Sequence, residues 1–591
     1  MNESSQSNAS TGSPFPVDWI YSRPREVENL LSSMSVQEQA QEILSMPLRC
    51  KVDALTLCER AEEVIQLLPE EEVYQMVKEK GESDSLAVLA IATPDQLQFM
   101  FDVEWWQGDK FKPDRAMEWV EILDQAEESK FMEWILTEEF EQKVMLMQSL
   151  IKVYKQDEMT DSYEGVEGLD HFSPDGVYDI FFKTEDYSAI KKAILRLREA
   201  EEGVYFSLME AVIWYPVTQT VERAYHWRQV RSSAHGIPEF EEAIQVYSAL
   251  KPEALREPAP DASHFERSDA YLPPAYPLID GGDHSFYKQC LGVMKAGSRF
   301  DAIRWEMVYL GNKVMVADQL DASDAESRKK VLQKVMGYVN IGLQLGAEGD
   351  PEKGARILEK TWLQPLFQVG YERLFQLKAK AQQLISERGK ALEYLMPPVD
   401  KERIAALMGR FPQIWSLETV DTAIDWRDFQ DLEEVVAMED FLDRQRFHAR
   451  LASTVLSLNE IGLEQLTQDS TFPESKDAMN IVCIVSTALA GHILYQGVQC
   501  EPLADSAARS FLKMFFLPNV YQGDAKEPNP DLIASFKEAL QNQPMAWVDS
   551  DKRYLDELLD FCVAQLKEQF GQLNPNAAID WKYTQGLCLK L

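Results

Sequence analysis

The densest group of residues that could do chemistry lies in the segment AYHWRQVRSSAHGIPEFEEAIQVY, residues 224–247. If its first half is helical, Arg228 and Arg231 lie one turn apart on the same face. Two neighbouring guanidinium groups can bind a carboxylate or a phosphate in a bidentate manner. The candidate ligand or interaction residues of the chain are therefore Tyr225, His226, Trp227, Arg228 and Arg231.

The same two arginines also have a structural interpretation. Three carboxylates, Glu239, Glu241 and Glu242, follow in the same segment, and the chain as a whole has 98 acidic against 59 basic side chains. Internal salt bridges are therefore the favoured role of Arg228 and Arg231.

Glycine and proline mark the end of this helix and the start of another. Gly236 is expected to end the first helix, and Pro238 to open the next. Helical spacing predicts that the second helix buries one face, which consists of Phe240, Ala243, Ile244 and Tyr247.

Motifs for the common chemistries are absent from the sequence. The segment GLQLGAEGDPEKGAR has glycines but no G-K-[ST] to bind a phosphate, and the seven histidines show no H-E-x-x-H spacing. There is also no G-x-S-x-G sequence around a nucleophilic serine. We therefore predict no catalytic residue, no metal and no cofactor, and expect a binding protein rather than an enzyme.

Charge and cysteine usage restrict the partners and the compartment. A formal net charge of −39 disfavours nucleic acids and anionic membranes, which are bound by clustered Lys and Arg. The seven cysteines are odd in number and never occur as C-x-x-C, which is typical of reduced thiols in a cytoplasm. The most apolar run, 481–495, is shorter than the ~20 residues of a membrane span. It is predicted to be a buried core helix, without membrane insertion.

Helix-start signals recur along the N-terminal part of the chain. Pro69 and Pro113 are 44 residues apart, as are Thr93 and Thr137, and each is followed by acidic residues that complement a helix dipole. An apolar stripe at helical spacing follows, made of Phe140, Val144, Met147, Ile151 and Tyr154. Helical hairpins at a fixed period indicate a short solenoid.

Four tryptophans occur between the helix starts of this region, and core packing is favoured over partner binding for all of them. They are Trp105, Trp106, Trp119 and Trp134.

The predicted fold class is all-α, because alternating β-α-β signals are absent. Asp350 and Pro351 are expected to begin one of the later helices, as N-cap and first residue. In the linker, VYDIFF (177–182) is a possible short strand or buried extended segment. The predicted organisation is a disordered polar tail (1–20), a helical-repeat domain (21–155), an acidic linker (156–186), a helical region (187–250), a long Pro-rich loop (251–284), a helical hairpin region (285–397) and a C-terminal helical domain (398–591).

Four separated segments resemble a family of large bacterial proteins that is known only as a domain of unknown function. They are LPEEEVYQMVKEKG, AYHWRQVRSSAHGIPEFEEAIQVY, GAEGDPEKGARILEKTWLQPLFQVGYERLF and IDWKYTQGL. This resemblance implies a helical, cytoplasmic bacterial protein and carries over no catalytic residues. The helix starts LPEEE and TPDQL are also similar to the superhelical N-terminal domain of bacterial magnesium transporters and to flagellar-switch helical repeats. Those repeats serve as regulatory or interaction surfaces.

Two functional hypotheses follow. The first is a non-catalytic helical scaffold that binds another protein, for which we expect an exposed apolar or aromatic patch. The second is an enzyme or a small-anion sensor, with a site between the 224–231 helix and the 251–284 loop. The sequence identifies neither the partner nor the oligomeric state.

Overall fold

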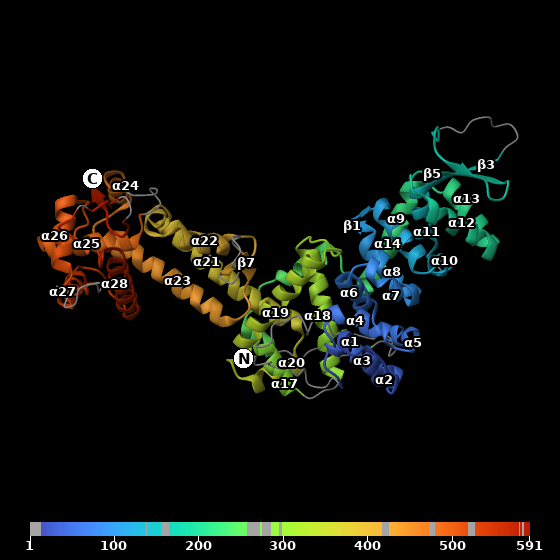
Figure 1. The fold of residues 1–591 in the computed structure, drawn as a ribbon, viewed down its shortest axis with the longest axis horizontal. Helices are drawn as coiled ribbons and strands as arrows, with labels where there is room; N and C mark the ends of the chain where they lie inside the picture. The colour runs from blue at the N-terminus through green and yellow to red at the C-terminus, as the bar shows by residue number, and fades with distance from the viewer. Residues whose placement is uncertain are drawn as a thin grey trace. The chain divides into compact units, whose positions relative to one another are not determined.

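The structure of the chain is a computed structural model. It describes residues 14–137, 139–156, 165–256, 272, 274, 285–294, 298–416, 425–471, 479–517, 526–577, 579–581 and 584–590. The fold is all-α with a few short strands, as predicted. The chain divides into two compact units, Met1–Tyr371 and Glu372–Leu591, which Figure 1 colours from blue to red along the sequence. The predicted tail up to residue 13 and most of the predicted 251–284 loop lie outside the described residues.

Unit 1 begins with a series of short helices and one small hairpin. These elements are α1 (Trp19–Ser22), α2 (Pro24–Ser32), α3 (Val36–Ser45), α4 (Leu48–Thr56), α5 (Ala61–Ile65), α6 (Glu70–Lys80), η1 (Ser83–Ser85), α7 (Leu86–Ile91), α8 (Pro94–Glu104), β1 (Trp106–Gln107), β2 (Lys110–Phe111), α9 (Pro113–Ala126), α10 (Lys130–Ile135) and α11 (Phe140–Leu150).

The helix starts read from the sequence are found in the fold. Pro69 is the N-cap of α6, and three glutamates form the first turn of that helix. Thr93 caps α8 in a reciprocal capping box with Gln96, and Pro113 is the first residue of α9. The helix expected at Thr137 begins at Phe140, after Glu139.

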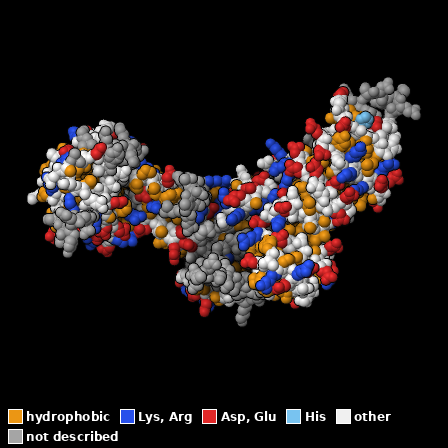
Figure 2. Space-filling view, viewed as in Figure 1, with side chains coloured by type: hydrophobic (Ala, Val, Ile, Leu, Met, Phe, Trp, Pro, Cys, Tyr) orange, Lys and Arg blue, Asp and Glu red, His pale blue; other side chains and the backbone are white. Residues whose placement is uncertain are grey.

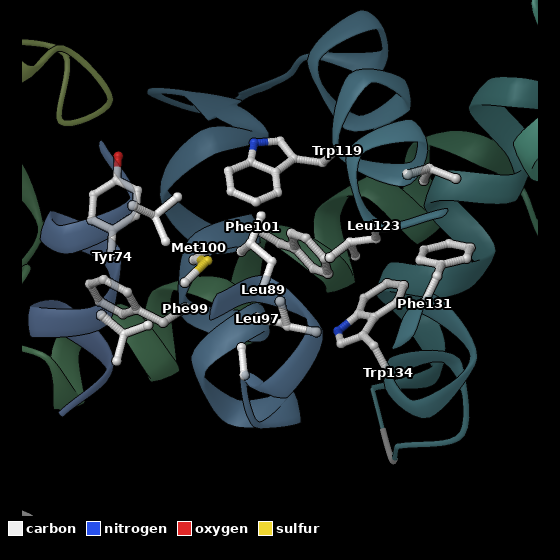
Figure 3. Close-up of a cluster of buried hydrophobic side chains, with 14 of the residues drawn as sticks. Tyr74, Leu89, Leu97, Phe99, Met100, Phe101, Trp119, Leu123, Phe131 and Trp134 are labelled. Atoms are coloured by element: carbon white, nitrogen blue, oxygen red, sulfur yellow. The ribbon is translucent and has the colours of Figure 1, made fainter. Parts of the chain in front are cut away.

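The tryptophans of this part form the core of unit 1, as predicted. Trp105, Trp119 and Trp134 are fully buried, and Trp106 is nearly so. The Phe101 ring stacks on Trp105 with centroids 4.1 Å apart and meets Trp134 edge-on at 5.0 Å. Figure 3 shows Phe101, Trp119 and Trp134 converging between helices. The resulting aromatic packing fixes α8, α9 and α10 against each other.

A three-stranded antiparallel sheet follows α11. It contains β3 (Ile151–Lys155), β4 (His171–Phe172) and β5 (Tyr178–Phe182) in the order β3-β5-β4. Strand β5 is the short strand expected in VYDIFF. The helical stripe predicted to reach Tyr154 was wrong beyond Leu150, because the run IKVYK pairs with β5 instead of continuing α11. Its β-branched and aromatic residues suit a pleated strand.

Unit 1 continues with α12 (Ser188–Ala200), α13 (Glu202–Trp214), α14 (Val217–Ala234), α15 (Phe240–Ala243), η2 (Ile244–Tyr247), η3 (Pro252–Arg256), α17 (Phe286–Val293), α18 (Ser298–Ala317), α19 (Ala325–Ala347), α20 (Pro351–Lys360) and the first part of α21 (Leu363–Leu395). Asp350 caps α20 through its side chain and Pro351 opens the helix, as expected. Helices α19 and α21 approach closely at two glycines. A Cβ on Gly342 would lie 2.0 Å from the Leu366 carbonyl oxygen, and one on Gly370 2.0 Å from that of Tyr338.

The turn after α14 is formed as predicted, but the element that follows is not one amphipathic helix. Gly236 has a φ of +71°, where a side chain would also collide with Tyr309. After it, α15 gives way to the tighter η2. The predicted buried face was therefore partly wrong. Ala243 is buried, but Phe240 at the start of α15 and Ile244 are exposed. Ile244 lies in η2, where 3₁₀ geometry rotates successive side chains differently from an α-helix.

Unit 2 contains the rest of α21, α22 (Pro398–Met408), β6 (Gln413–Ser416), β7 (Asp425–Asp428), α23 (Leu432–Arg450), the π-helical η5 (Leu451–Val455), α24 (Glu460–Asp469), α25 (Ile481–Tyr495), β8 (Leu503–Ala504), α26 (Asp505–Phe515), α27 (Pro530–Gln541), α28 (Asp549–Phe570) and β9 (Leu589–Lys590). Helix α25 is the buried core helix predicted from the apolar run, packed against α26, α27 and α28. No helix within the described ranges combines the length and apolarity that crossing a membrane requires.

Candidate functional site

The arginine cluster singled out in the sequence lies on α14, and Arg231 is held in internal ion pairs. Its guanidinium donates to both carboxylate oxygens of Asp102, at 2.7 and 2.9 Å, and to Glu139 at 2.6 Å. Gln142 accepts a further hydrogen bond at 2.9 Å. Burial disfavours the charged guanidinium, but Asp102 and Glu139 more than compensate and raise the pKa of Arg231. The carboxylate partners belong to α8 and to the start of α11 rather than to the nearby 239–242 segment.

Arg228 is engaged by the main chain. It donates to the carbonyl oxygen of Asp102 at 2.7 Å and to that of Gly108 at 3.1 Å. Its guanidinium also lies over the Trp106 ring, 5.5 Å from the centroid. Burial is the main cause that lowers the pKa of Arg228 from its usual value. This geometry favours the structural role of both arginines over an anion clamp.

The other candidate residues of α14 differ in exposure. Tyr225 is partly buried against Trp106, with ring centroids 5.6 Å apart. His226 and Trp227 are exposed, and Trp227 keeps 48% of its surface accessible. The cluster is thus divided into an inner part that holds α14 onto α8 and an outer part that faces solvent.

A cavity of about 420 Å³ lies beside the end of α14 and does not include these arginines. Gly236, Glu242, Tyr309, Lys313 and Trp362 are among its lining residues. Lys313 lies 3.4 Å from Glu242 and donates to Gln364 at 3.3 Å.

One group of side chains next to this turn has the composition of a metal site. Glu70 and Glu71 of α6 and His235 at the end of α14 each offer a ligand atom, all within 4.8 Å of one another. His235 Nδ1 and Glu71 Oε1 are 2.8 Å apart, and the imidazole packs on the Phe99 ring. Glu70 and Glu71 lie in the first turn of α6, where the helix dipole stabilises their carboxylates without a metal. The contact between His235 and Glu71 joins α6 to the end of α14, which is its structural interpretation.

A second cavity, of about 440 Å³, is lined by strand β3, and no sequence motif pointed to it. One wall is Gln148 and the whole of β3, and the other is Val212, Ile213, Trp214 and Val217 at the junction of α13 and α14. Gln148 fixes this junction, since its amide donates to the carbonyl oxygens of Val212 and Tyr215, at 3.3 and 2.8 Å.

The charged residues that line this cavity are lysines. Lys152 and Lys155 belong to β3, and Lys183 follows β5. Lys183 donates to the Gln148 carbonyl oxygen at 2.5 Å. Burial first, and then the positive charge of Lys152, lower the pKa of Lys183. Lys155 pairs with Glu210 at 2.5 Å, just outside the lining. The charged residues on the lining are therefore all basic, and Glu210 compensates the charge of Lys155, in a chain of strongly negative net charge.

Apolar side chains are unusually exposed at the same junction. Trp214 keeps 68% of its surface accessible and Val217 60%, and Tyr215 between them is also exposed. The indole nitrogen of Trp214 donates to Glu210 at 2.9 Å. This hydrogen bond orients the ring, whose surface stays largely exposed to solvent. Figure 2 shows hydrophobic side chains interspersed with basic and acidic ones on the visible face near the three-stranded sheet and α12–α13. We define the junction surface as Trp214, Tyr215 and Val217.

The comparisons with known proteins give a family but no activity. Residues 28–590 match a family of unknown function designated DUF6178. No curated protein and no solved structure matches the chain. The resemblance to a family of unknown function is thereby confirmed, and it covers nearly the whole sequence.

Proposed function

The chain belongs to the DUF6178 family, and we propose that it is a non-catalytic helical scaffold that binds another protein through the junction surface. The observation that carries this proposal is the exposure of Trp214, Tyr215 and Val217 within one four-residue stretch beside a cavity. Exposed apolar groups gathered at one place, rimmed by polar residues, are typical of protein-binding sites. Aromatic residues are the commonest energetic centres of such interfaces.

Further support comes from the sequence. The helix starts that recur at a spacing of 44 residues favour a helical-repeat scaffold in the N-terminal part. All seven cysteines are buried thiols, which supports the expected cytoplasmic location. Binding at the junction surface would leave the α14 arginines in their internal contacts.

The proposal is tested by photo-crosslinking in the native host, with p-benzoylphenylalanine in place of Trp214, because this photoreactive amino acid keeps a large aromatic side chain at the position. The matched control carries the same amino acid in place of Tyr495 of α25, which is 70% exposed but lies in unit 2. We expect one protein to be crosslinked at position 214 and not at position 495, and to form a stoichiometric complex when both proteins are purified. The same weak products at both positions, and no complex, would contradict the proposal.

A further inference from the structure

The free side of strand β3 has the backbone geometry of a docking edge. Gln156 donates to the Val177 carbonyl oxygen at 2.9 Å, and Lys183 to that of Leu150 at 2.8 Å, which fixes the pairing of β3 with β5. In an antiparallel ladder, residues alternate between pairs that bond to the partner strand and residues whose N–H and C=O point away. Val153 and Lys155 are of the second kind. Their main-chain groups therefore point toward the side of β3 that carries no strand among the described residues.

The cavity adjoins this strand, and its lining includes both Val153 and Lys155. The five residues of β3 form one wall, and the junction of α13 and α14 forms the other. An extended segment placed between them would run beside β3 and reach Trp214 and Val217 with its side chains. Strand addition to an exposed edge is a common mode of peptide recognition, in which the backbone supplies hydrogen bonds and alternate side chains supply specificity.

The two faces of β3 differ in the side chains they would offer to such a segment. Ile151 and Val153 are buried on one face, while Lys152 and Tyr154 lie on the other. The Lys152 ammonium lies 5.1 Å from the centroid of the Tyr154 ring. Residues of an added strand that face the core side would therefore meet apolar surface, and residues on the opposite face would meet Lys152.

We propose that the segment bound at the junction surface is an extended, acidic peptide of the partner that adds to β3 as a fourth strand. This inference rests on the proposed function and names the chemistry of its partner. Charge complementarity selects an acidic segment, since Lys152, Lys155 and Lys183 are the charged residues on the lining. Alternation of apolar and acidic residues matches the two faces of β3.

The test uses the purified full chain and two fluorescent eight-residue peptides, one alternating Val and Glu and the other alternating Val and Lys. Binding is measured by fluorescence anisotropy at low and at high salt. We expect the Val–Glu peptide to bind and the Val–Lys peptide not to bind, with affinity that falls as salt screens the lysines. Stronger binding of the Val–Lys peptide, or no binding of either peptide, would overturn the proposal.

A proline separates strand addition from simple charge attraction. Lys155→Pro removes the outward-facing amide N–H at the end of β3 and the lysine charge, whereas Lys155→Ala removes the charge alone. We expect Lys155→Pro to bind the Val–Glu peptide about three- to tenfold more weakly than Lys155→Ala, the loss that corresponds to one hydrogen bond. Equal affinities of the two variants, with both proteins folded by circular dichroism, would overturn strand addition.

Failure of the strand-addition mode can be distinguished from failure of the proposed scaffold function. If crosslinking at position 214 captures a partner but the proline variant binds it as well as the alanine variant does, the scaffold function stands and the strand-addition mode fails. If position 214 captures nothing while the Val–Glu peptide still binds through β3, the junction surface is not the natural docking site.

Discussion

Two cationic regions of unit 1 differ in whether protein oxygen atoms enclose their charged groups. On α14, the guanidinium groups of Arg228 and Arg231 are enclosed by oxygen atoms of α8, α11 and the β1–β2 turn. Along β3, Lys152, Lys155 and Lys183 line a cavity beside an open strand edge and exposed apolar side chains. The first region links helices through ion pairs and hydrogen bonds, and the second has room for a ligand. The charged cluster that is densest in the sequence thus forms internal contacts, whereas lysines outside any sequence motif line a cavity.

The largest effect that tests this comparison is expected at Arg231. Replacing it by Ala leaves Asp102, whose side chain is 6% exposed, without its bidentate partner. Loss of one member of a largely buried pair should lower the free energy of unfolding of unit 1 by about 3 kcal/mol. Urea denaturation followed by tryptophan fluorescence of the core measures the change. Arg223→Ala, at an exposed position of the same helix, is the control and should stay within about 0.5 kcal/mol. Equal changes in the free energy of unfolding for the two substitutions would refute the stabilising role of the Arg231–Asp102 ion pair.

The next largest effect is expected on binding at Trp214. Trp214→Ala should weaken partner binding by about 2 kcal/mol, roughly thirtyfold, as for an aromatic hot spot. Unit 1 should keep its stability, because the ring is mostly exposed. The matched variant is Trp227→Ala, on the outer part of the α14 cluster, and it should bind normally. Weaker binding by Trp227→Ala than by Trp214→Ala would instead make α14 the interaction site.

Much of the fold could be predicted because its determinants are local. Asp350 and Pro351 specify a helix start within two residues, and the run that became α25 is apolar on all sides and must be buried. Strand β3 could not be predicted in this way. Ile151 and Tyr154 continue the helical spacing of α11, and only pairing with β5, about 30 residues later, makes this stretch a strand. Long-range pairing leaves little trace in local periodicity.

The contact partners of the candidate residues could not be predicted for a related reason. Asp102 and Glu139 lie 129 and 92 residues from Arg231, so the sequence could predict an internal pair but not the partners. His235 and Glu71 are 164 residues apart. The lysines of the β3 cavity follow no motif at all. The alternation in IKVYK, with VYDIFF after an acidic loop, was the signal of a sheet with an open edge.

A third effect concerns pH, through Lys183. Its pKa in the free protein is lowered by burial and by Lys152, and an acidic strand in the cavity would raise that pKa again. The protonated amine is thus the form that favours the peptide. Affinity for the Val–Glu peptide should therefore decrease as the pH rises through the pKa of Lys183 in the free protein. Anisotropy titrations across the alkaline range measure this, and Lys183→Gln should remove the earliest part of the decrease and leave the part due to Lys152 and Lys155 at higher pH. An affinity that rises with pH would contradict the cationic character of the cavity.

The smallest effect is expected at Lys152, and it separates the two regions most directly. Lys152→Gln removes one charge from the outer face of β3 without opening a cavity in the core, so the free energy of unfolding should change by less than about 0.5 kcal/mol. Binding of the Val–Glu peptide should weaken about two- to fivefold at low salt, and the difference from the unsubstituted chain should vanish at high salt. A loss of stability comparable to that of Arg231→Ala would mean that Lys152, like Arg231, ties the fold together. The contrast between an enclosed and an open cationic region would then fail.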